Sequence, residues 1–129
     1  MKYYTGKIAL NIECDLDTCA DWHRNGIILD KSKMQDSDNS IFKDYGIYET
    51  DKGYVANHLR AILDLMEQGQ CDYLRGFKND FLTSNKYDRE LMMQAKKLKG
   101  NKNWEDIDYL LGEEYREKWL EVQNGSKFT

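Results

Sequence analysis

The chain contains no proline, only three cysteines and only two histidines among its 129 residues. No apolar run approaches the ~18 residues that a membrane span requires, and the first ten residues lack the features of a signal peptide. Three cysteines without scaffold spacing argue against a disulfide framework, so we expect reduced thiols and a cytoplasmic location. The missing proline, with abundant Lys, Asn, Asp and Tyr, indicates an AT-rich genome, such as that of a low-GC bacterium or its mobile elements, including phage.

Short motifs that carry common chemistries are also missing. There is no lysine-containing phosphate loop, no G-x-G-x-x-G, no G-x-S-x-G and no H-E-x-x-H. Residues 36–40, DSDNS, resemble the start of a calcium loop, but Ile41 stands where that loop needs glycine and Ile47 where it needs glutamate. We therefore expect no cofactor and no nucleotide-driven reaction.

The chain length and charge favour one acidic domain. A chain of 129 residues can bury a core without disulfides or metal, and no repeat or linker divides it. We expect a single domain over residues 1–129, with a strand-rich part at 1–50, a helical part at 51–123 and a frayed tail at 124–129. The formal charge of −4 argues against a nucleic-acid binder, which usually leaves a basic footprint.

Residues 53–68 carry the clearest periodicity. Val55, Leu59, Ile62 and Met66 recur at helical spacing, which predicts a central helix that buries one face and is capped by residue 50 or 51. His58 lies within the apolar arc, so we interpret it as a packed core histidine. Its burial would then resist protonation and lower stability at acid pH.

Several strands are expected in the first fifty residues. Alternation over residues 7–14 predicts a half-buried strand entered near Tyr3 or Tyr4. Further strands are predicted at residues 27–29 and 45–49, and a polar surface loop at residues 30–40.

Residues 15–24 allow two interpretations. Asp15 or Asp17 caps a helix that ends at Asn25-Gly26, or Asn25-Gly26 forms the turn of a hairpin. The lack of period-two alternation favours the helix.

The remaining residues read as helices. We predict helices over residues 71–82 and 84–100, and one helix of about 20 residues from Asn103 that bends at Gly112. Strands followed by helices predict an α+β fold, in which a small antiparallel sheet from the N-terminal third packs on a four-helix C-terminal half.

Cysteine and histidine residues are the candidates for chemistry. Zinc needs thiolates and neutral imidazoles, and five residues are candidates to supply them: Cys14, Cys19, His23, His58 and Cys71. The C-x-x-C pair of structural zinc sites is missing, and buried free cysteine is common, so we assign no metal. A thiol nucleophile is the second possibility, with Cys19 or Cys71 activated by a histidine, and Cys71 lies at a predicted helix start, where the dipole favours a thiolate.

Aromatic and basic residues suggest binding surfaces. Nine tyrosines and three tryptophans exceed the apparent needs of the core, and both types are enriched at protein interfaces. The partner-binding candidates lie on the last predicted helix: Tyr109, Tyr115, Trp119 and Leu120. The basic run Lys96–Lys102 suggests phosphate contacts, although such a run is usually a solvated helix end.

We therefore expect a non-enzymatic cytoplasmic binding or regulatory module that acts through a protein partner or as a homodimer, without nucleic acid or membrane. The alternatives are a small metal- or thiol-dependent enzyme and, more weakly, a nucleic-acid binder.

Overall fold

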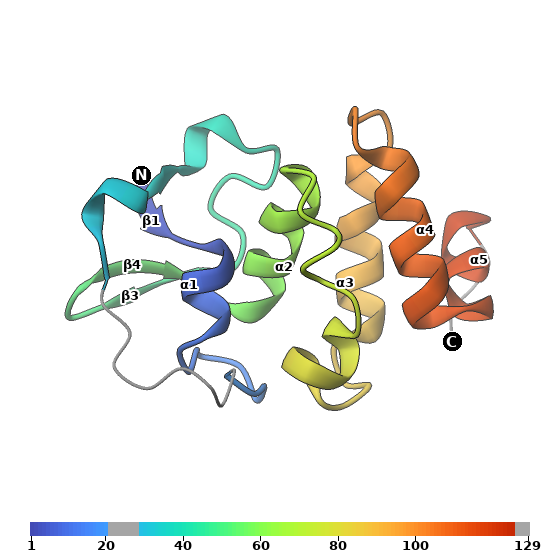
Figure 1. The fold of residues 1–129 in the computed structure, drawn as a ribbon, viewed down its shortest axis with the longest axis horizontal. Coiled ribbons are helices and arrows are strands. Elements are labelled where there is room, and N and C mark those ends of the chain that lie inside the picture. The colour runs from blue at the N-terminus through green and yellow to red at the C-terminus, as the bar shows by residue number, and fades with distance from the viewer. Residues whose placement is uncertain (21–28, 126–129) are drawn as a thin grey trace.

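The computed structural model describes residues 1–20 and 29–125 (Figure 1). A small sheet lies at one end of the molecule, and three helices lie at the other: α3 (Asp88–Ala95), α4 (Trp104–Tyr115) and α5 (Glu117–Gln123). The central helix α2 (His58–Glu67) lies between them. The predicted α+β class is confirmed.

Four short strands form the sheet: β1 (Lys2–Tyr4), β2 (Gln35–Asp36), β3 (Ile47–Thr50) and β4 (Gly53–Ala56), in the order β2-β1-β4-β3. β1 pairs antiparallel with β2 but parallel with β4, so the expectation of an antiparallel sheet is wrong and the sheet is mixed. The parallel pair arises because the β3–β4 hairpin joins the sheet through β4, beside β1.

The central helix begins later than its periodicity suggested. Residues 53–56 belong to β4, and Asn57 caps α2 by accepting a hydrogen bond from the Arg60 amide (3.0 Å). Neither residue 50 nor residue 51 is the cap. Every residue from 58 to 66 is buried, so α2 is covered on all sides rather than on one face.

The segment after β1 forms a helix where a strand was expected. α1 (Gly6–Leu10) packs against α2, and both Ala9 and Leu10 are fully buried. Consecutive buried residues do not fit a strand with one face in solvent. The strand predicted over residues 7–14 is therefore wrong, although its expected entry at Tyr3 or Tyr4 lies in β1. The alternation was misleading because Ala9, which stands between Ile8 and Leu10, is apolar as well and is buried.

The polar region at residues 30–40, which was expected to be a surface loop, contains regular secondary structure. Residues 30–40 contain η1 (Lys31–Lys33), β2 and η2 (Ser37–Asn39), and Ser37 is buried. Residues 15–20 are neither helix nor strand, so the favoured helix does not begin at Asp15 or Asp17. The rest of that prediction, with residues 27 and 28 of the expected strand, lies outside the described residues.

The predicted helix over residues 71–82 is also wrong. Only η3 (Lys78–Leu82), a single π-helical turn, forms there, because Gly76 adopts a φ of +80° that ends regular helix. The Glu114 carboxylate accepts hydrogen bonds from the amides of Gly76 and Lys78, both at 3.1 Å. The next predicted helix is realised as α3 followed by η4 (Lys96–Leu98).

The C-terminal residues form two helices rather than one. The break falls at Arg116, which has a φ of +56°, and not at Gly112. The break lets α5 fold back, so that the Trp119 indole donates to Asp108 (2.7 Å) and packs 6.0 Å from Trp104. In an unbroken helix Trp119 and Asp108 would lie roughly 16 Å apart along the axis.

We expect Gly112→Ala to raise the free energy of unfolding by about 0.5–1 kcal/mol. Gly112 lies inside α4, and a Cβ added there would meet no atom within 4 Å. Alanine therefore lowers the entropy of the unfolded chain without a clash. Urea denaturation would measure the gain, and a loss of stability would show that Gly112 is needed for the curvature of α4.

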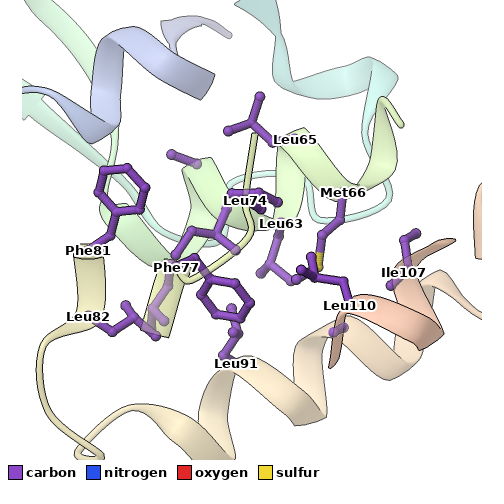
Figure 2. Packing of buried hydrophobic residues seen from close by; sticks show 14 of the residues in the cluster. Leu63, Leu65, Met66, Leu74, Phe77, Phe81, Leu82, Leu91, Ile107 and Leu110 are labelled. Carbon is purple, nitrogen blue, oxygen red and sulfur yellow. The ribbon is translucent and has the colours of Figure 1, made fainter. Parts of the chain in front are cut away.

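Figure 2 shows how the core draws side chains from several elements into one cluster. Leu63 and Met66 of α2 meet Phe77 and Leu91 from the segments around η3 and α3, and α4 adds Ile107. No helix of the described residues is long and apolar enough to cross a membrane.

A buried ion pair joins α2 to the sheet. The Arg60 guanidinium and the Asp64 carboxylate lie 2.9 Å apart, at 0% and 1% exposure. Asp64 also accepts hydrogen bonds from the hydroxyls of Tyr3 (2.6 Å) and Thr5 (2.7 Å). Arg60 donates to the Tyr3 hydroxyl and to the carbonyls of residues 43 and 45. This network explains how the polar side of α2 is accommodated without solvent.

Candidate functional site

Two features of the structure have functional potential: a thiol–imidazole cluster beneath the β3–β4 hairpin, and a groove beside α4.

The thiol–imidazole cluster contains Cys14, Thr18 and His58. The Thr18 hydroxyl lies 2.7 Å from His58 Nδ1 and 3.4 Å from the Cys14 sulfur. His58 Nε2 lies 2.7 Å from the carbonyl oxygen of Ile12, and the Leu16 amide donates to the Cys14 sulfur at 3.4 Å. His58 is fully buried at the start of α2, whereas Cys14 is partly exposed.

The contacts within the cluster favour a thiolate on Cys14 and a protonated ring on His58. Burial raises the pKa of the Cys14 thiol, but the nearby His58 and the hydrogen bonds from Thr18 and the Leu16 amide outweigh burial and leave this pKa lowered. Burial also works against protonated His58, yet contact with Cys14 and with the carbonyls of Ile12 and Ala9 leaves its pKa raised.

His58 is thus a packed histidine, as expected, but the expectation that it resists protonation is wrong, because its bonding partners favour the charged ring. The consequence for stability reverses as well. A raised pKa in the folded state means that His58 stabilises the protein below its ordinary pKa of 6.5, and that this contribution is lost as the pH rises through the raised value.

A cavity of about 470 Å³ opens beside the cluster. Its lining joins the Cys14 segment to the hairpin, with Ile12, Tyr48 and Val55 among the apolar and aromatic residues. Charged residues line it too: Glu13, Asp15, Asp51 and Lys52. Cys14, which is partly exposed and lines this cavity, is therefore next to a space that a small molecule can enter.

The structure does not bring the other predicted ligands to this cluster. Among the described residues, no three His, Cys, Asp or Glu side chains are placed to hold a metal ion. Cys19 is exposed, Cys71 lines the groove at α4, and His23 lies outside the described residues. The only pair brought together is Cys14 with His58, in the part of the chain that can be described.

Cys71 is not an activated nucleophile. Burial, with Asp106 and Asp72 nearby, raises the pKa of its thiol to about 11. No helix begins at residue 71, so the expected help from a helix dipole is missing as well. Thr18, which contacts both Cys14 and His58, was missed because a hydroxyl at this position has no sequence signature.

The groove lies between α4 and residues 69–75 and has a volume of about 380 Å³. One line along α4 faces it, since Asp106, Tyr109, Leu110 and Glu113 recur at helical spacing. Cys71 and Leu110 are buried at 8% and 4% exposure and form an apolar floor, while Tyr109 is 68% exposed. Further carboxylates of the lining are Asp72 and Glu114, and Arg75 is its one guanidinium.

Of the four predicted partner-binding residues, two are exposed in the structure and two are buried. Tyr109 and Leu120 are exposed, at 68% and 58%. Tyr115 and Trp119 are core residues, at 4% and 1%. Tyr115 packs edge-on against Phe77, and the fold-back of α5 turns Trp119 toward Asp108 and Trp104. The carboxylates at 106 and 113 were missed, although their spacing of three and four residues from Tyr109 marks one helix face.

The basic run resembles a solvated helix end. Lys97, Lys99 and Lys102 are exposed, while Lys96 donates to the carbonyl of Val122 at 3.0 Å. The two aromatics near this run have partners within the fold. Trp104 packs on Trp119, and the Tyr87 hydroxyl accepts a hydrogen bond from the amide of Asp17 at 3.0 Å.

Comparison with family models, with curated proteins and with solved structures found no match for this chain.

Proposed function

We propose that this protein is a cytoplasmic binding module that holds a Lys- or Arg-bearing segment of a partner protein in the groove beside α4. The observation that carries the proposal is the line of Asp106, Tyr109 and Glu113 over an apolar floor. A flat aromatic between two carboxylates suits a basic side chain, which can pair with the charge and stack on the ring.

The two carboxylates are available to an incoming cation. Within residues 1–20 and 29–125, the side chains of Asp106 and Glu113 are exposed and make no hydrogen bond or ion pair. Glu114, by contrast, is engaged by the amides of residues 76 and 78. Asp72 pairs with Arg75 at 3.5 Å. Asp106 and Glu113 therefore carry the proposed recognition.

Spacing defines the expected ligand. Glu113 lies seven positions after Asp106 in the helix, which places the two about 10 Å apart along the axis. Three residues of peptide in the polyproline II conformation rise about 9 Å and complete one turn, so side chains three residues apart point to the same side. A segment with two basic residues three apart therefore reaches both carboxylates, with an apolar residue between them over Leu110.

The test is fluorescence anisotropy with a labelled hexapeptide that carries two arginines three residues apart. We expect the double substitution Asp106→Asn with Glu113→Gln to weaken binding about tenfold, since each exposed charge pair contributes about 0.2–1 kcal/mol. Added salt is expected to weaken the wild-type complex and to have less effect on the variant.

The matched control is Glu105→Gln with Glu117→Gln. These exposed residues carry the same charge but do not line the groove. An equal loss in both double variants would mean that the peptide responds to overall charge, which would overturn the proposal. So would a concentration-dependent dimer that only the groove variant abolishes, because the occupant would then be a second copy of the chain.

A further inference from the structure

We infer that Cys14 is a nucleophilic thiolate that undergoes exchange with a neutral or cationic small disulfide, and that His58 accepts its proton through the Thr18 hydroxyl. This site is separate from the proposed binding groove, and neither depends on the other.

The hydrogen bonds of the cluster are satisfied in two protonation states. In the neutral state, the Cys14 thiol donates to the Thr18 oxygen, and the Thr18 hydroxyl donates to His58 Nδ1. His58 Nε2–H donates to the Ile12 carbonyl in both states. When two protons shift along this chain, the sulfur becomes a thiolate and the ring becomes an imidazolium. The two contacts of the Thr18 hydroxyl are retained with their direction reversed, and the contact of His58 Nε2 with the Ile12 carbonyl is unchanged.

The charged state has further support. The thiolate accepts a hydrogen bond from the Leu16 amide as well as from Thr18, and amides are good donors to an anion. The lowered pKa of Cys14 and the raised pKa of His58 agree with this exchange of a proton. Thr18 is a positioning residue here, since it acts on the sulfur and the ring together.

The surroundings indicate which disulfides fit. From β3, Tyr48 lines the cavity, and its hydroxyl donates to the carbonyl of Glu13 at 3.1 Å. Burial, followed by the charges of Cys14 and Asp15, raises the pKa of Tyr48 to about 12, so it stays neutral. Glu13, Asp15 and Asp51 face it with negative charge and Lys52 with positive charge. The excess of carboxylates disfavours an anionic reagent near the sulfur.

The exchange conserves atoms and electrons. The Cys14 thiolate attacks one sulfur of the disulfide R–S–S–R, a new sulfur–sulfur bond forms, and the original one breaks. The thiolate R–S⁻ leaves and takes the proton held by His58, which gives R–SH and neutral imidazole. The product is a mixed disulfide on Cys14, which an added thiol reverses by the same steps.

The test follows the reaction with 4,4′-dithiodipyridine, a neutral disulfide whose released thiopyridone absorbs light, and locates the modified cysteine by peptide mass spectrometry. For the wild-type protein we expect Cys14 to react first and to remain reactive below the ordinary thiol pKa of ~8.5. Thr18→Val should slow Cys14 about tenfold near neutral pH, because its thiolate fraction falls, and should change the rate less than twofold at about pH 9.5, where the thiol is ionised in any case.

Thr18→Ser keeps the hydroxyl and should restore the wild-type pH profile. His58→Gln tests the base directly, but His58 is buried, so the partly exposed Thr18 keeps the test valid if that variant fails to fold. Near-ultraviolet circular dichroism of each variant shows whether the fold is retained. Superimposable pH profiles for wild type and Thr18→Val, or reaction of Cys71 before Cys14, would overturn the inference.

Discussion

Replacement of Asp64 by alanine is expected to lower the free energy of unfolding by about 3–5 kcal/mol. The substitution leaves the Arg60 guanidinium charged and buried at 0% exposure, without its carboxylate. The hydroxyls of Tyr3 and Thr5 lose their acceptor in the same step. A loss of this size is a large part of the roughly 5–15 kcal/mol that stabilises a domain.

An exposed pair of the same chemistry provides the control. Asp72 and Arg75 lie 3.5 Å apart, but their side chains are 97% and 77% exposed. Asp72→Ala should therefore change the free energy of unfolding by less than about 1 kcal/mol. Urea denaturation of both variants measures the contrast, and equal midpoints would show that the Arg60–Asp64 pair contributes no more than a surface contact.

A variant that lacks both charges shows how much of the loss in Asp64→Ala comes from leaving the Arg60 charge unpaired in the core. Arg60→Met combined with Asp64→Leu should be less destabilising than Asp64→Ala alone, since no unpaired charge remains in the core. Recovery is expected to be partial, because the carbonyls of residues 43 and 45 still lose the guanidinium. A double variant less stable than Asp64→Ala would contradict this account.

The regular spacing of apolar residues predicted the elements in which no residue interrupts the pattern. The α+β class, the central helix, α3 and the strand around residue 47 follow from local patterns. Errors arose where one residue interrupts a pattern. Gly76 ends a stripe that Leu74, Phe77 and Phe81 would otherwise continue, and Arg116 breaks another so that Trp119 can reach Asp108.

The candidate sites were harder to predict, because they depend on contacts between distant segments. Cys14 meets His58 across 44 positions of sequence, and neither spacing nor composition reports that approach. Local cues instead offered Cys19 or Cys71 as the nucleophile, although burial, with Asp106 and Asp72 nearby, raises the pKa of the Cys71 thiol. In the groove, the one lining residue that was predicted to bind a partner is Tyr109, and its exposure follows from its position on one helix face.

Gly46→Ala is the second substitution with a large expected effect. It tests how tightly residues 43–46, called the 40s segment below, are held against α2. Gly46 has a φ of +71°, which costs about 1–2 kcal/mol for a residue with a Cβ. The added Cβ would also lie 2.7 Å from the Cβ of Arg60 and 2.9 Å from Oδ1 of Asn57.

Neither neighbour can move freely. Asn57 caps α2 and donates its amide to the Gly46 carbonyl at 2.7 Å, while Arg60 is held by the buried ion pair. Overpacking of this kind costs about 1–3 kcal/mol, so the total expected loss is about 2–5 kcal/mol.

Gly6→Ala separates the two causes. Gly6 has a φ of +65°, close to the +71° of Gly46, but a Cβ there would meet nothing nearer than the Leu65 side chain at 3.5 Å, which is an ordinary contact. It therefore reports backbone strain without a clash, and the additional loss at Gly46 measures the close approach to Arg60 and Asn57. If thermal unfolding showed the same loss for both variants, the 40s segment would have room to move away from α2. The carbonyls that it presents to Arg60 would then be a flexible part of the buried network, whereas a larger loss at Gly46 would show that they are fixed.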